Sequence, residues 1–462
     1  ADGNDLIVSM SFQMNRCVRV QVAGLIGLTG DTDVAVHTHE GNVNQATGVN
    51  ILDLQQIKNA LGQPVDNSNF PKDVNVTGGT INVLDMQAAK NNLLSPEIEC
   101  EPVLCEPHWA EGLFPSNGID ANVDALIVFD DGSGPALYAG GGFTAAEAVT
   151  LNRIGKWNGT SWSSLGSGMN STVLALTAFD DGTGPALYAG GGFDTAGGVN
   201  ANSVAKWNGT SWSPLGGGTN RGVFALTVFD DGAGPALYAG GSFTTAGAVS
   251  ANRIARWDGK TWSALGSGMN DSVFALTVFD DGTGPALYAG GRFTAAGGAT
   301  ANHIAKWDGA DWSPLGSGMD SLVRTLTVFD DGSRPALYAG GTFARAGGIN
   351  ANHIAKWNGT SWSTLGIGMN HWVLALTVFD DGAGPALYAG GYFNRAGGVD
   401  AGRIVKWDGA SFSPLGSGIN IVVYALAGFA DGSESPLYAG GFFTTAGSGE
   451  SFNMARWSRH CP

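Results

Sequence analysis

The chain has 462 residues, and its 73 glycines amount to more than twice the usual share of about 7%. Charged residues make up 14% of the chain, and the formal net charge is -17. Nucleic-acid phosphates repel a negative chain, so this charge argues against a nucleic-acid partner. No run approaches the roughly 18 apolar residues of a membrane span, so none is expected.

Residues 1–39 are predicted to form a short β segment. The sequence begins ADGNDLIV, without methionine, which fits a mature secreted chain after signal removal or a boundary chosen for expression. The runs DLIVSMSF, CVRVQVAG and DVAVHTH each have the composition of a short strand. Three strands cannot form a sandwich alone, so we expect them to pack on the next module or to pair with another molecule.

Residues 40–97 hold a duplicated pattern, NVNQATGVNILDLQQIKNALG and DVNVTGGTINVLDMQAAKNNLL. Each copy is an oxygen-rich loop that leads into an amphipathic stretch, and we predict helices near 51–61 and 83–94. Ca²⁺ takes oxygen ligands from such loops, although the same residue types also cap helices without a metal. Both interpretations remain open at this point.

The duplicated pattern resembles the dockerin, a small α-helical module with two calcium loops that binds cohesin domains in extracellular assemblies. The resemblance implies bound Ca²⁺ and a protein partner for residues 40–97. Its ligand positions correspond in the first loop to Asn42, Asn44, Asn50 and Asp53. In the second loop they correspond to Asp73, Asn75, Thr77 and Asp85.

Four cysteines lie outside the repeats described below, at Cys17, Cys100, Cys105 and Cys461. Cys105, in a linker of residues 98–108, precedes the repeats and Cys461 follows them. We therefore predict a Cys105–Cys461 disulfide and a Cys17–Cys100 disulfide, although four cysteines allow three pairings. Either bridge would imply an oxidising, extracellular location.

Residues 109–462 are built from a unit that recurs every 50 residues. The tract LYAGG begins at Leu137, Leu187, Leu237, Leu287, Leu337, Leu387 and Leu437. The next hydrophobic tract ends at Trp157, Trp207, Trp257, Trp307, Trp357, Trp407 and Trp457. Seven equal copies indicate seven equal supersecondary units.

Each unit contains four short apolar runs of the types VxALTVF, PALYAGG, IAKW and WSPLG, bounded by Asp-Gly and Asn-Gly turns. The runs are too short for helices and are flanked by turn residues, so they predict four antiparallel strands. Four strands per repeat of about 40–50 residues is typical of a β-propeller. The predicted fold is therefore mainly β, with seven four-stranded blades.

The seventh unit lacks its WSPLG run, and a matching segment lies upstream of the first unit. We predict that a strand at residues 109–114, with Trp109 and Leu113, closes the last blade and hides its edge. The repeat resembles the kelch repeat, which has a di-glycine after a β-run and then an aromatic residue and a tryptophan separated by a turn. This resemblance covers residues 109–462 and implies the same propeller architecture.

Two repeated polar features are predicted to be scaffold. The sequence FDDG recurs from Phe129 to Phe379 at the first hairpin turn, where its carboxylates either bind cations or form solvated turns. A ring of cations is expected to pair with these acids or to stack on neighbouring tryptophans. The ring consists of Lys156, Lys206, Arg256, Lys306, Lys356, Lys406 and Arg456.

Positions that differ between the units are more informative, and they gather in the loops of the face opposite to the Asp-Asp-Gly turns. Aromatic, Arg and His side chains together suit a sugar or an acidic partner, although drift in exposed loops gives the same pattern. The candidate ligand-binding residues, all in units four to six, are Arg292, His303, Asp320, Arg345, His353, His371, Trp372, Tyr392 and Arg395.

Three functions are consistent with this organisation. The first is a secreted, non-enzymatic binding or assembly protein whose N-terminal part docks to a partner or to another copy, giving a filament if residues 5–12 are donated as a strand. The second is a lectin-like propeller. The third is a glycan-active enzyme, which the absence of GxSxG, HExxH and P-loop motifs disfavours.

Overall fold

The computed structural model describes residues 6–12, 16–22, 107–110, 118–431 and 435–458. The chain divides into two compact units with their boundary between Cys105 and Glu106. Strands β1 (Leu6–Phe12) and β2 (Arg16–Val22) of the first unit form an antiparallel hairpin, with Leu6 opposite Val22. Two of the three strands predicted at the N-terminus are therefore present.

Several predictions fall on other residues. The third N-terminal strand, the α-helical dockerin-like module of residues 40–97 with all eight predicted calcium ligands, and Cys100, Cys105 and Cys461 lie outside the described residues. Cys17 belongs to strand β2, and its predicted partner is not among the described residues. The calcium site and both disulfides remain predictions.

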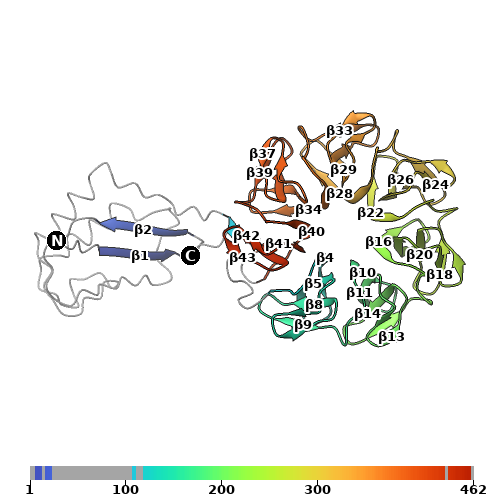
Figure 1. Cartoon of the computed structure of the whole chain (residues 1–462), viewed down its shortest axis with the longest axis horizontal. Helices are drawn as coiled ribbons and strands as arrows, with labels where there is room; N and C mark the ends of the chain where they lie inside the picture. Colours follow the sequence, from blue (N-terminus) through green and yellow to red (C-terminus); the bar gives the residue numbers. More distant parts are fainter. Residues whose placement is uncertain (1–5, 13–15, 23–106, 111–117, 432–434, 459–462) are drawn as a thin grey trace, which may run out of the picture. The chain divides into compact units, whose positions relative to one another are not determined.

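The second unit is a seven-bladed β-propeller, as predicted from the repeat. Seven four-stranded antiparallel sheets are arranged around a central axis (Figure 1). The first strand of each blade lies nearest the axis and contacts the corresponding strands of its neighbours. These inner strands are β4 (Val123–Asp130), β10 (Val173–Asp180), β16 (Val223–Asp230), β22 (Val273–Asp280), β28 (Val323–Asp330), β34 (Val373–Asp380) and β40 (Val422–Gly428).

The other strands follow outward in sequence order. The second strands are β5 (Pro135–Gly141), β11 (Pro185–Gly191), β17 (Pro235–Gly241), β23 (Pro285–Gly291), β29 (Pro335–Gly341), β35 (Pro385–Gly391) and β41 (Leu437–Phe442). The third strands are β8 (Ile154–Trp157), β14 (Val204–Trp207), β20 (Ile254–Trp257), β26 (Ile304–Trp307), β32 (Ile354–Trp357), β38 (Ile404–Trp407) and β44 (Met454–Ser458). The outer strands are β9 (Trp162–Ser164), β15 (Trp212–Pro214), β21 (Trp262–Ala264), β27 (Trp312–Pro314), β33 (Trp362–Thr364), β39 (Phe412–Pro414) and β3 (His108–Trp109).

Each blade also contains a small hairpin that the sequence did not predict. These hairpins lie in the Gly- and Ala-rich stretch, which carries no apolar periodicity, and a bridge such as Met169 to Ala196 ties each one to the loop before the inner strand. The hairpins are β6 (Ala145–Ala146) with β7 (Val149–Thr150), β12 (Thr195–Ala196) with β13 (Val199–Asn200), β18 (Thr245–Ala246) with β19 (Val249–Ser250), β24 (Ala295–Ala296) with β25 (Ala299–Thr300), β30 (Arg345–Ala346) with β31 (Ile349–Asn350), β36 (Arg395–Ala396) with β37 (Val399–Asp400) and β42 (Thr445–Ala446) with β43 (Gly449–Glu450).

The ring is closed by strand β3, as predicted. Trp109 pairs with Trp457 of β44, and the indole Nε1 of Trp109 donates to the carbonyl of Leu415 at 2.9 Å. Trp212 makes the same bond to Leu165 in an ordinary blade, so Trp109 takes the place of an outer-strand tryptophan. The structure describes only residues 107–110 of this segment, and Leu113 lies outside the described residues.

The core lies in the seams between blades. Each LYAGG tyrosine is fully buried, and the glycines allow the next inner strand to approach. A Cβ on Gly190 would lie 2.6 Å from Cγ1 of Val223 in the following blade, so only glycine fits there. Among the described residues no helix is long and apolar enough to cross a membrane.

Candidate functional site

The Asp-Asp-Gly turns form one face of the propeller, here called the turn face, and their acids are already engaged. The first aspartate stabilises the turn, since Asp180 Oδ1 accepts the amides of Gly182 and Gly184. The second aspartate of each turn is bonded to side chains of its own blade. Asp181 Oδ2 accepts from Lys206 Nζ at 2.7 Å and from the hydroxyl of Tyr188 at 2.8 Å.

This Asp–cation–Tyr arrangement, here called the triad, recurs in every blade and confirms the predicted pairing of the cation ring with the acids. The lysines approach the LYAGG tyrosines, as at 5.8 Å between Lys206 Nζ and the Tyr188 ring, because the two residues are opposite in register. The sequence also allowed these cations to stack on tryptophan, but in the structure the lysines lie over the tyrosine rings instead. The triads are scaffold rather than a vacant cation site.

The opposite face, here called the loop face, is built from the loops before the inner strands and after the second strands. One polar position shapes every loop. Asn170 Oδ1 accepts the amides of Asp194 and Thr195, and Asp320 accepts those of Ala344 and Arg345 at 2.9 Å each. Asp320, a predicted ligand-binding residue, is therefore placed as a loop brace.

The position just before the third strand is a second brace. His303 and His353 adopt left-handed φ values of 66° and 74°, and His303 Nδ1 lies 3.2 Å from the carbonyl of Gly291. Arg253 at the equivalent position donates to the carbonyls of Ser242 and Phe243. Burial lowers the pKa of both histidines below its ordinary value. His303 is thus oriented towards the backbone of its own loop.

Four of the predicted residues come together in blades five and six. The His371 ring lies 4.9 Å from Trp372, 5.7 Å from Tyr392 and 6.4 Å from His353, measured between centroids. Trp372 and Tyr392 meet edge to face at 5.7 Å, and Trp372 is 41% exposed. We call His353, His371, Trp372 and Tyr392 the aromatic cluster. It presents an amphipathic surface on the loop face.

The predicted arginines do not join this cluster by any contact that the structure records. Arg292 forms a two-pronged pair with Asp271, through Nε at 2.9 Å and Nη2 at 3.1 Å. Arg395 pairs with Asp400 at 3.3 Å, with both side chains well exposed. Arg345 is exposed at the edge of its small hairpin.

Sequence reasoning missed a set of residues nearer the axis. The second residue of the inner strand, which corresponds to the third residue of β40, differs between blades, whereas its neighbours are nearly constant. The side chains are partly exposed, and consecutive ones meet: Phe224 stacks on Phe274 at 5.7 Å, and the Arg324 guanidinium lies 4.3 Å from the Phe274 centroid. We call these residues the axial ring. It consists of Asp124, Leu174, Phe224, Phe274, Arg324, Leu374 and Tyr424.

The axial ring contains two unusual charges. Burial raises the pKa of Asp124 to about 6, although a hydrogen bond from Asn122 opposes the shift. Burial, reinforced by the charge of Arg292, lowers the pKa of Arg324, whose Nε is shielded from solvent and has no hydrogen-bond partner among the described residues. The signal in the sequence that could have revealed the axial ring is the variation of this one strand position between the repeats.

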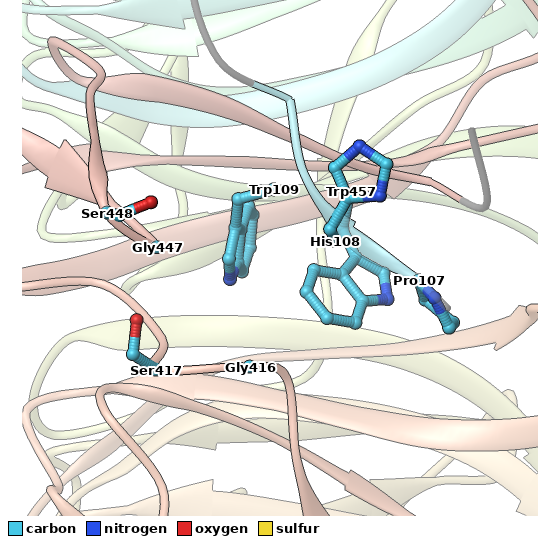
Figure 2. Close-up of a pocket in the computed structure, with 8 residues that line it drawn as sticks. All are labelled: Pro107, His108, Trp109, Gly416, Ser417, Gly447, Ser448 and Trp457. Carbon is cyan, nitrogen blue, oxygen red and sulfur yellow. The ribbon is translucent and has the colours of Figure 1, made fainter. Parts of the chain in front are cut away.

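A cavity of about 490 Å³ lies at the closing seam, lined by Pro107, His108, Trp109, Gly416, Ser417, Gly447, Ser448 and Trp457. Figure 2 shows the Trp109 indole standing beside Gly447 and above Ser417. Both glycines adopt a positive φ, 56° at Gly416 and 63° at Gly447, and a Cβ on Gly447 would lie 3.2 Å from Cβ of Trp109. This cavity is therefore a product of ring closure. The described residues contain no group of three or more His, Cys, Asp or Glu side chains that could hold a metal.

The second unit therefore belongs to the architectural class of seven-bladed β-propellers, with variable side chains on one face. Comparison with protein-family models and with curated proteins gives no match. Among solved structures, the chain is similar to the extracellular domain of BT4673 from B. thetaiotaomicron, a protein assigned as a hybrid two component system. That match has 13% identity and a TM-score of 0.48, and it covers 77% of this chain but only 40% of that chain.

Proposed function

We propose that the protein is a secreted, extracellular, non-enzymatic binding protein whose propeller is a kelch-like scaffold for recognition through its loop face. The observation that carries this proposal is the aromatic cluster. His371, Trp372 and Tyr392 occupy positions where some other blades carry small residues, namely Ser321, Ser272 and Ser242, and no other blade has aromatic residues at the first two positions. Exposed aromatic side chains on a rigid frame supply contact area at low entropic cost, which is typical of recognition surfaces.

The test exchanges the cluster for residues that the fold already tolerates. We expect the full chain to bind a ligand on a glycan or protein array, and the triple variant His371→Ser, Trp372→Ser, Tyr392→Ser to lose that binding with an unchanged melting temperature. Arg334→Leu on the turn face is the matched control. Retention of binding by the triple variant would contradict the proposal, and turnover of the bound glycan would contradict its non-enzymatic part.

We further propose that residues 40–97 are a dockerin-like module that binds Ca²⁺ and attaches the chain to a partner or to another copy, and that attachment to another copy builds filaments. The support is the duplicated oxygen-rich loop followed by an amphipathic stretch. Calorimetric titration of the full chain with Ca²⁺ should give binding that the second-loop variant Asp73→Ala with Asp85→Ala weakens. Electron microscopy with and without Ca²⁺ tests self-association, and monodisperse single particles in both conditions would contradict it.

A further inference from the structure

The side chains of the axial ring differ from blade to blade, so one sector of the propeller differs chemically from the rest. The inner strands VLALTAFD, VFALTVFD and VRTLTVFD keep the Val, Leu and Phe residues that pack in the seams, yet their second residues are Leu174, Phe224 and Arg324. The seams between blades are packed in the same way whichever residue stands at this position, so packing does not require the residue to vary. The ring therefore carries side-chain chemistry that the scaffold does not need.

Arg324 is a charged residue of the axial ring that has no ion-pair partner among the described residues. Its guanidinium covers the face of Phe274, and none of the ion pairs among the described residues includes it. Arg292, the next arginine on this face, already pairs with Asp271. A partly buried guanidinium without hydrogen-bond partners is costly, and a carboxylate that accepts two parallel N–H bonds would satisfy it.

An aromatic surface connects the axial ring to the loops. Tyr424 shares a side-chain hydrogen bond with Tyr392, and Tyr392 contacts Trp372. Trp372 precedes the inner strand β34, which lies beside the strand of Arg324 in the ring. The Arg324 guanidinium, which extends from blade five over Phe274 of blade four, therefore lies at the same end of the inner strands as the aromatic rings of blades six and seven.

The groups around these rings favour a sugar over a purely apolar acid. The tyrosine hydroxyls and the His371 imidazole stand beside the aromatic faces, and they would lose hydrogen bonds to water under an apolar ligand. A pyranose offers C–H groups to the negative face of an indole and hydroxyls to the polar groups at its edge.

We propose that the axial end of the loop face binds an acidic saccharide, with the sugar carboxylate held by Arg324 and the sugar ring packed on Trp372 and Tyr392. This inference rests on the proposed function, because it names the ligand class of the loop face. Arg324 gives the site its preference for acidic over neutral sugars, whereas contact with the aromatic cluster contributes to the affinity for both.

Calorimetric titration of the full chain tests this at fixed ionic strength, with trigalacturonic acid, galactotriose of the same linkage and phenylacetate as probes. Trigalacturonic acid should bind best. Arg324→Leu should reduce its affinity about tenfold, to that of galactotriose, as expected for a lost charge-assisted pair. Leu174 and Leu374 occupy the same position in other blades, so this variant should fold. Arg334→Leu, the same change on the turn face of the same blade, should leave the affinity unchanged.

The outcomes separate the inference from the proposed function. If Trp372→Ser weakens binding and Arg324→Leu does not, the loop face recognises ligands but the carboxylate site is wrong. Equal affinity for trigalacturonic acid and galactotriose overturns the inference in the same way, and phenylacetate binding as tightly as trigalacturonic acid overturns the choice of a sugar. If neither variant alters the binding of any probe, the inference fails and the proposed function loses its support.

Discussion

At the residue scale, the second position of the inner strand shows how a repeat can keep its fold and vary its chemistry. Asp124 occupies this position in the first blade, next to Asn122, and its charge acts on Tyr424 in the last blade. Burial holds the pKa of this carboxyl at about 6, above the ordinary value of 3.8. The folded state therefore disfavours ionisation of Asp124.

This shift predicts a pH-dependent stability effect. When the pKa of a carboxyl is higher in the folded state than in the unfolded state, its protonated form stabilises the folded protein. This contribution to stability is complete below about pH 4 and is lost as the pH rises through about 6. Asp124→Asn should therefore stabilise the protein at about pH 8 by on the order of 2 kcal/mol, and should change little at about pH 4. Urea unfolding at both pH values measures this. An equal effect at the two values would contradict the buried, ionised carboxylate.

Other side chains of the predicted site were harder to assign from sequence. Asp320 and His303 have the chemistry of ligand-binding groups, but both bond to the backbone of their own loops. Composition cannot distinguish these uses, because turn braces and binding sites draw on the same residue types. His371, Trp372 and Tyr392 were predicted and do meet, because aromatic side chains in adjacent loops exceed what a turn needs.

At the element scale, the four-stranded blade was predictable because its runs are bounded by Asp-Gly and Asn-Gly turns at constant spacing. The axial ring was not. A register shift between Val173 and Ala175 interrupts the regular alternation of side chains at Leu174, so the direction of this residue cannot be obtained by counting along the strand. The small hairpins were missed for a different reason, since stretches such as TAGGVN have no apolar period.

The paired glycines of the second strand give a prediction at this scale. A Cβ on Gly191 would lie 2.1 Å from the backbone oxygen of Thr172, which cannot move without disturbing the inner strand, whereas a Cβ on Gly192 would meet nothing closer than 3.9 Å. Gly191→Ala should destabilise the protein by about 3 kcal/mol, as for overpacking in a core. Gly192→Ala is the control, and its melting temperature should match that of the wild type. Similar behaviour of the two variants would disprove the close approach.

At the scale of the whole molecule, the triads form a belt that passes through all seven blades. Despite their burial, hydrogen bonds from Lys206, Lys306 and Lys356 hold the pKa values of Asp181, Asp281 and Asp331 at about 2. Because these values lie below the ordinary 3.8, the stability that these three triads contribute is complete above about pH 4 and is lost as the pH falls towards 2.

The repetition of the belt predicts a steep acid transition. The carboxylates of Asp181, Asp281 and Asp331 are protonated in the same interval, so we expect the propeller to unfold cooperatively between about pH 4 and pH 2. Near-ultraviolet circular dichroism of the tryptophans reports this transition. Lys206→Met, which leaves Asp181 without its cation, should lower the melting temperature at neutral pH, whereas the exposed Lys260→Met should not. A melting temperature that stays constant from pH 4 to pH 2 would contradict the role of the belt.

The closing strand also determines how the propeller responds to mechanical force. His108 lies opposite Ser458, so the incoming and outgoing chain leave β3 and β44 at the same end of an antiparallel pair. A load applied between the two ends would separate this short pair one bond at a time, as in unzipping, rather than shear all its bonds together. Tension between the two ends of the propeller would therefore open the ring at its last blade.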